Sequence, residues 1–165
     1  KAGKELEIKS LFFSEEARRE LGVLTMAVRE ILQLTTDCYI NTDHEMAHHV
    51  EPLEQVIDGL TKAIKKNHLA RLQAGRCSIE LGFILSDLLT DFERISDHCS
   101  NIAVAVIELQ HDALDSHRYL NEMKRDSEAF RQLYAEFREK YVLPESAYTR
   151  RQTEEYRSLP EPEAE

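Results

Sequence analysis

Positive charge is outnumbered by negative charge in this chain, and long apolar runs are lacking; each feature disfavours a class of protein. Its 165 residues include 21 Lys and Arg against 31 Asp and Glu, which leaves a formal net charge of −10. That charge disfavours nucleic acid and anionic membrane surfaces as partners. No apolar run approaches the ~18–20 residues that a membrane-spanning helix needs, so we expect no direct membrane insertion.

Cysteine and glycine are too scarce for several kinds of site. The three cysteines lie far apart in the sequence, at positions 38, 77 and 99. They match neither a disulfide framework nor a paired-cysteine zinc site, and they suit a reducing, cytosolic compartment. The five glycines are scattered, so no glycine-rich phosphate loop is present. No segment alternates apolar and polar residues with a period of two, so no strand is predicted.

Apolar residues instead recur at alternating spacings of three and four, the pattern of amphipathic helices. Ser14, followed by two glutamates, predicts the start of a first helix that ends near Ile40. A second helix is predicted to begin at a capping box that opens with Thr42, and to end before Gly75. Pro52 falls inside that second pattern, so we expect it to kink the helix.

Two further helices complete the pattern. Ser78 is the predicted cap of a third helix that runs to Ala113. A fourth is predicted over residues 115–141, with an aromatic stripe at its end, and Pro144 stops it. The predicted core stripe in the middle of the third helix consists of Phe92, Ile95, Cys99 and Ile102.

Four long helices with short connections predict an all-α fold. We expect an antiparallel helical bundle with a three-helix core and a fourth, C-terminal helix. Residues 14–141 would form this bundle, with 1–13 as the end of a preceding segment or linker. Residues 142–165 end in the acidic, proline-rich LPEPEAE and are predicted to be a disordered tail. The opening residues show no initiator Met and no signal-peptide shape, so we expect a fragment of a longer protein or a processed chain.

Two acidic pairs mark the second and third helices. Glu54 and Asp58 are four residues apart, as are Glu93 and Asp97, and Asn101 follows four residues later. Counted from the turn between the helices, the pairs lie at matching distances, so antiparallel helices would place them at the same height. Four carboxylates at one level suit cations such as Mg, Ca, Mn, Fe or Zn, with Asn101 orienting the ligands. The alternative is that all four are solvated side chains paired with Lys and Arg.

Two weaker patterns are also present. His44–His48 reads HEMAH and matches the HExxH signature of zinc hydrolases, in which Glu45 would be the general base. The G-x-x-H extension of that signature is missing downstream. Basic residues crowd the end of the second helix, where we expect them to complement the helix dipole; these residues are Lys65, Lys66, His68 and Arg71.

The acidic motifs resemble a known family. Leu89–His98, which reads LTDFERISDH, together with Asn101–Ala103, resembles the third-helix signature of PhoU domains. Val50–Asp58, which reads VEPLEQVID, is similar to the second helix of that family. The match is closer still to the PhoU-like C-terminal region of bacterial Na⁺/phosphate cotransporters, where Phe13–Ala17 resembles the start of the second repeat.

The resemblance carries its own implications for fold and function. It implies a three-helix bundle per repeat and metal held by the acidic motifs, here Glu54, Asp58, Glu93 and Asp97. The metal would be Fe, Zn, Mn or Mg. It further implies a non-catalytic, cytoplasmic regulatory domain of a sodium-dependent phosphate transporter, with a membrane transport domain of the same or another protein as partner. A scaffolding bundle without metal is the alternative.

Assembly can also be predicted. The third helix is apolar beyond its main stripe, and one helical layer cannot hide that much apolar surface. The proteins that the chain resembles carry two repeats packed side by side, whereas this chain supplies one. We therefore expect a symmetric homodimer in which each chain takes the place of the other's second repeat. The acidic face that carries Glu54 and Glu93 would lie near the dimer axis.

Overall fold

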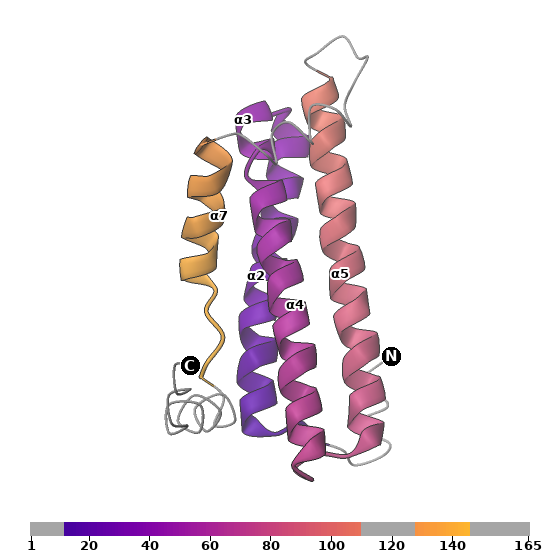
Figure 1. Ribbon diagram of the computed structural model, residues 1–165. Coiled ribbons are helices and arrows are strands. Elements are labelled where there is room, and N and C mark those ends of the chain that lie inside the picture. The colour runs from indigo at the N-terminus through magenta and orange to yellow at the C-terminus, as the bar shows by residue number, and fades with distance from the viewer. Residues whose placement is uncertain (1–11, 110–127, 146–165) are drawn as a thin grey trace, which may run out of the picture.

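The computed structural model describes residues 12–109 and 128–145, and within these ranges every regular element is a helix. Three long helices, α2, α4 and α5, form the bundle, with α4 antiparallel to the other two, and a shorter helix packs along α4 at the side (Figure 1). The predicted all-α bundle with a fourth C-terminal helix is therefore confirmed. The helices are α2 (Glu15–Asn41), α3 (His44–Ala47), α4 (Val50–Gln73), α5 (Ile79–Glu108) and α7 (Glu128–Lys140).

Three of the predicted helix ends are confirmed. The Ser14 hydroxyl accepts a hydrogen bond from the backbone N–H of Ala17 at 3.2 Å, and Ser78 accepts one from Leu81 at 3.3 Å. Each hydroxyl satisfies an N–H that the first turn of a helix leaves unpaired. Gly75 follows the end of α4 with a φ of 66°, a conformation that a residue without a Cβ adopts at little cost.

The prediction of one second helix kinked at Pro52 is wrong. The helix is interrupted before that residue, because α3 ends after a single turn and α4 starts afresh at Val50. Pro52 therefore lies in the first turn of α4, where a missing N–H costs no helical hydrogen bond. The predicted capping residue is also wrong by one position. Thr42 has a φ of 50°, and Asp43 caps α3 by accepting from the N–H of Met46 at 3.0 Å.

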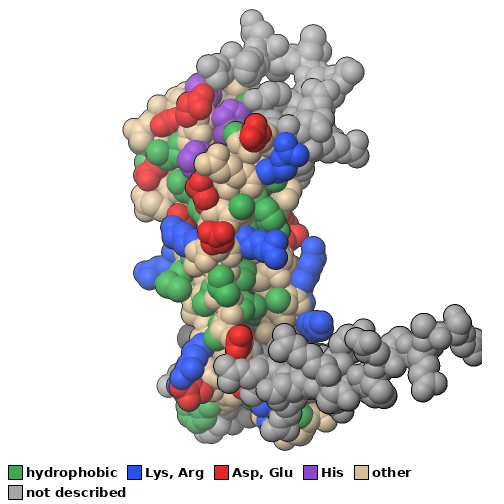
Figure 2. Space-filling model, turned by 60° about the vertical axis from the view of Figure 1, so that its left-hand side comes forward, with side chains coloured by type: hydrophobic (Ala, Val, Ile, Leu, Met, Phe, Trp, Pro, Cys, Tyr) green, Lys and Arg blue, Asp and Glu red, His purple; other side chains and the backbone are tan. Residues whose placement is uncertain are grey.

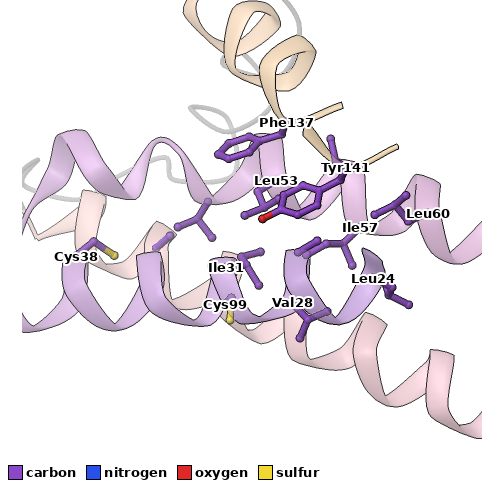
Figure 3. Close-up of a cluster of buried hydrophobic side chains, with 14 of the residues drawn as sticks. Leu24, Val28, Ile31, Cys38, Leu53, Ile57, Leu60, Cys99, Phe137 and Tyr141 are labelled. Carbon is purple, nitrogen blue, oxygen red and sulfur yellow. The ribbon is translucent and has the colours of Figure 1, made fainter. Parts of the chain in front are cut away.

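The core lies where α2, α4 and α5 meet, and α7 adds to it. In Figure 3, Phe137 of α7 and Tyr141, which follows the last residue of α7, lie over Leu53 and Ile57 of α4. Two aromatic residues of the predicted stripe are thus part of the core. The earlier part of the predicted fourth helix, residues 115–127, lies outside the described residues, as does the predicted tail from residue 146.

The predicted core stripe of α5 is displaced. Cys99 is buried as expected, and Phe92 and Ile95 are half-buried against the core, but Ile102 is 41% exposed, and Ser96 and Ala103 are buried as well. The reason is that α5 packs against both α2 and α4, which buries a broader arc than one stripe. Ser96 tolerates burial because its hydroxyl donates to the backbone carbonyls of Phe92 and Glu93 within its own helix.

Arg71 has a structural role that differs from the predicted one. It is 1% exposed, and its two terminal nitrogens donate to the two oxygens of Glu20 at 2.9 and 2.7 Å. Asn67 donates to the same carboxylate at 2.8 Å. The pair joins α2 to α4, so Arg71 does not act as an exposed cation that complements the end of α4.

A single acidic residue fastens the end of α7 to α2. The Lys140 ammonium donates to both oxygens of Glu30 at 2.7 and 2.8 Å, and the Tyr141 hydroxyl donates to the same carboxylate. Burial, followed by the hydrogen bond to Glu30 and then by the charge of that carboxylate, raises the pKa of Tyr141 well above its usual value. Beside this contact, α4 and α7 leave an apolar groove of about 690 Å³ that Gly59 and Leu60 help to line.

Candidate functional site

The register of α4 against α5 agrees with the height expected for the acidic pairs. The hydroxyl of Ser100 on α5 donates to Glu51 on α4, which fixes the two helices at that level. Asp58 lies seven residues after Glu51, and Glu93 lies seven before Ser100. The other two carboxylates lie three residues from the same anchors. In antiparallel helices these equal offsets place each α4 carboxylate at the level of one on α5.

Equal height does not bring the carboxylates together. Lys65 donates to both oxygens of Glu93 at 2.9 and 3.1 Å, and the Lys62 ammonium lies 3.5 Å from Asp58. Asp97 and Asn101 are exposed. Each helix thus supplies acids to a flank rather than to one shared centre, and two of the acids are paired with lysines of α4.

These residues do not fit a preformed metal centre within one chain. Among residues 12–109 and 128–145, no three His, Cys, Asp or Glu side chains are grouped so that they could hold a metal ion. A cation at Glu93 would have to displace Lys65, whose side chain is 42% exposed and free to swing into water. A metal ion could therefore compete with Lys65 for the Glu93 carboxylate. The metal centre itself stays a prediction.

The HExxH segment lies at one end of the bundle. In Figure 2 histidine side chains gather at the same end of the molecule as α3. His44 starts the single turn of α3, and His48 follows its last residue, so the two histidines do not lie on one long helix as a zinc hydrolase requires. Within the described part of the chain, no third His, Cys, Asp or Glu side chain is grouped with these two so that the three could hold a metal ion.

None of the three thiols is primed for nucleophilic chemistry. Burial raises the pKa of Cys99 and of Cys38 above the usual value, which disfavours the reactive thiolate. Burial also raises the pKa of Cys77, and the nearby charge of Arg71 only partly opposes it.

The PhoU domain model matches residues 24–106, half of the chain, and these residues contain both acidic motifs. The chain belongs to the PhoU domain family. The matched residues include nearly all of the three-helix core, whereas α7 lies beyond them. The resemblance to PhoU domains is therefore confirmed, while the link to a sodium/phosphate cotransporter stays a prediction.

One curated relative is the "Phosphate-specific transport system accessory protein PhoU homolog 1" of Thermotoga maritima. It is 27% identical over 107 residues, which are 62% of this chain and 46% of the relative. The match thus spans about half the length of that relative. No solved structure matches the chain. No helix of the described residues is long and apolar enough to cross a membrane.

Proposed function

We propose that this PhoU domain regulates sodium-dependent phosphate uptake, without catalysing a reaction, from the cytoplasmic side of the membrane. The observation that supports the proposal is the family match over residues 24–106, which suggests a role in regulating phosphate transport. The partner would be a membrane transport domain of the same or another protein. The charged outer surfaces of α4 and α5 offer polar contacts for such a partner.

Phosphate uptake in cells tests this role. Removal of the domain from the host should uncouple the rate of radioactive phosphate uptake from the phosphate supply, because the regulator would be missing. Restoring the wild-type chain should restore the coupling. The control variant Arg131→Ala, which changes an exposed residue of α7 outside the matched residues, should restore it equally well. Uptake that responds normally to phosphate supply without the domain would contradict the proposed function.

Metal binding is the finer part of the proposal. Glu54, Asp58, Glu93 and Asp97 would bind Fe, Zn, Mn or Mg, with Asn101 orienting them. Hard cations prefer such oxygen ligands, and a divalent ion at Glu93 would compete with the single charge of Lys65. Supporting observations are the equal heights of the two pairs and the weak hold expected of exposed lysine ion pairs.

Elemental analysis of protein purified without chelator tests the site. Glu93→Ala/Asp97→Ala should lose most of the bound metal, and Lys65→Met should keep or increase it because the competing cation is gone. Asp87→Ala/Asp91→Ala is a matched control, since these acids have the same spacing on the same helix. Equal metal content in all four proteins would remove the site assignment.

A scaffolding bundle without metal is the second candidate. The observation that favours it is the ion pairing of Glu93 with Lys65 and of Asp58 with Lys62, which neutralises two of the four acids without any metal. This alternative predicts that EDTA leaves the melting temperature unchanged. In either case we propose that the chain acts as a homodimer, because the described helices leave large apolar side chains exposed that a second copy would cover.

A further inference from the structure

The outward side of α2 differs from every other long helix surface of the bundle. Between residues 22 and 40 it exposes four large apolar side chains, and Arg29 is the one charged residue among its exposed positions. We call this surface the α2 face. Its apolar members are Met26, Leu32, Tyr39 and Ile40, which are 56%, 44%, 66% and 70% exposed.

The neighbouring helices carry more charge on their outward sides. The helix α5 also exposes four large apolar side chains, but charged residues such as Asp87, Asp91 and Arg94 lie between them; the four are Ile79, Phe83, Ile102 and Leu109. Lys62, Lys65 and Lys66 lie on the outward side of α4, and acids such as Asp87 and Asp91 lie on that of α5. The centres of protein interfaces are depleted of charge, and exposed apolar patches mark such contacts. Among the long surfaces of the described helices, the α2 face is therefore the one that another molecule can cover while removing few charged side chains from water.

The two threonine hydroxyls of the α2 face are already satisfied within the helix. The Thr25 hydroxyl donates to the Leu21 carbonyl and the Thr36 hydroxyl to the Leu32 carbonyl, both at 2.7 Å. Burying a hydroxyl that keeps its hydrogen bond costs far less than burying one that loses water. At one end, a Cβ added to Gly22 would meet nothing within 4 Å, so a partner helix can approach the backbone there.

Two opposite charges on the α2 face are placed for self-recognition. Arg29 lies four residues before Gln33, and Asp37 lies four residues after it. Asp37 accepts from the neutral amide of Gln33 at 2.9 Å, and neither Arg29 nor Asp37 has an ion pair with another described residue. Around the same midpoint, Met26 lies seven residues before and Ile40 seven after.

We infer that two copies of this chain pair through the α2 face, with the helices antiparallel and Gln33 at the two-fold axis. In an isologous contact, residues equally far on either side of the axis meet. Arg29 of one copy then meets Asp37 of the other, and Met26 meets Ile40. We assign a second copy of the chain as the partner because, in this register, it supplies both an opposite charge for each charged residue and an apolar side chain for each apolar one. Two chains that each have a net charge of −10 also need a contact surface that carries little like charge. This inference rests on the proposed homodimer and assigns it to α2 rather than to the acidic face expected from the sequence.

Charge reversal tests the contact by sedimentation at micromolar concentration. Arg29→Glu and Asp37→Arg should each raise the dimer dissociation constant at least tenfold, since each creates a like-charge pair across the axis. The double variant should regain the wild-type constant, which also shows that the single variants are not merely misfolded. Arg94→Glu, on the exposed side of α5, is the matched control and should leave the constant unchanged.

Cross-linking tests the register. In a Cys77→Ser background, with the other two cysteines buried, Gln33→Cys should form a disulfide-linked dimer under mild oxidation, because two copies of residue 33 meet at the axis. Thr90→Cys on α5 should stay monomeric on a reducing-agent-free gel. A wild-type monomer would overturn the homodimer itself. A stable dimer whose dissociation constant is unchanged by the α2 charge reversals would overturn only the assignment to α2, and so would equal cross-linking at residues 33 and 90. The proposed role in phosphate uptake does not depend on any of these results.

Discussion

At the scale of single residues, the buried pair of Glu20 and Arg71 is the most demanding feature of the core. Both side chains are 1% exposed, so each charge depends on the other for the interactions that water would supply. Removing one partner of a buried pair leaves an unpaired charge and typically costs 3–5 kcal/mol. We expect Glu20→Gln to lower the free energy of unfolding by roughly that amount in a urea titration.

A surface pair provides the comparison for this prediction. Glu15 pairs with Arg19 on the same helix, but both side chains are about two-thirds exposed. Exposed pairs contribute at most about 1 kcal/mol, so Glu15→Gln should barely move the urea midpoint. Similar effects of the two substitutions would show that the Glu20 pair does not organise the contact between α2 and α4.

His68 predicts a loss of stability toward acid. Burial lowers its pKa, and the adjacent charge of Arg71 lowers it further while Glu20 partly opposes both. Because the folded pKa lies below the unfolded value of about 6.5, the unfolded state binds the proton more readily. The stability that neutral His68 contributes to the fold is therefore fully present above about pH 6.5, and it is lost as the pH falls through that value toward the lowered pKa of the folded state. His68→Gln should flatten the fall in unfolding free energy between about pH 7 and 5, whereas His98→Gln, an exposed change, should not.

At the scale of secondary-structure elements, the glycines of α4 and of the turn after it have opposite requirements. Gly59 lies inside α4, and an added Cβ would meet nothing within 4 Å. Replacing it with alanine should stabilise the protein by about 1 kcal/mol, through helix propensity alone. Gly75 has a positive φ, so the same substitution there should destabilise it. Thermal unfolding followed by circular dichroism measures both, and a destabilising Gly59→Ala would mean that the groove beside α7 closes on that position.

Sequence patterns predicted these elements where the deciding interactions are local. The serine caps at 14 and 78 and the glycine after α4 depend on neighbours within three or four residues, and all three were recognised. The break before Pro52 depends on Asp43 capping a separate turn, which competes with a longer helix of similar apolar spacing. The displaced stripe of α5 depends on packing against two helices at once, which the spacing along one helix does not encode.

The candidate site was predictable to the same extent. Spacing gave the heights of the acidic pairs, because antiparallel helices rise equally per residue. Spacing did not predict the ion pair between Lys65 and Glu93, because that contact depends on how far each helix is rotated about its own axis. Glu20 was also missed, although it lies three residues after Ala17 and four before Leu24, on the same apolar stripe.

At the scale of the whole molecule, the described chain consists of a family core and an addition. The PhoU match ends at residue 106, and α7, which lies beyond it, covers α4 and reaches α2 through Glu30. The helix α7 covers one side of α4, and the remaining outer sides of α4 and α5 are charged. The α2 face is therefore the apolar surface that we assign to assembly. The distribution of charge over the helices thus separates an assembly surface from the surface that carries the acidic motifs.

This separation predicts how thermal stability depends on protein concentration. A folded dimer that dissociates on unfolding gains about 1.4 kcal/mol of apparent stability per tenfold rise in concentration. We therefore expect the melting temperature of the wild-type chain to rise steadily from about 1 to 100 μM, the range in which such contacts form. Arg29→Glu should show a weaker dependence that begins at a higher concentration, since its dimer has a larger dissociation constant and gains less by mass action. Glu93→Ala/Asp97→Ala should keep the wild-type dependence, because the acidic motifs lie away from the α2 face; loss of the dependence in that variant would place the dimer contact at the acidic motifs instead.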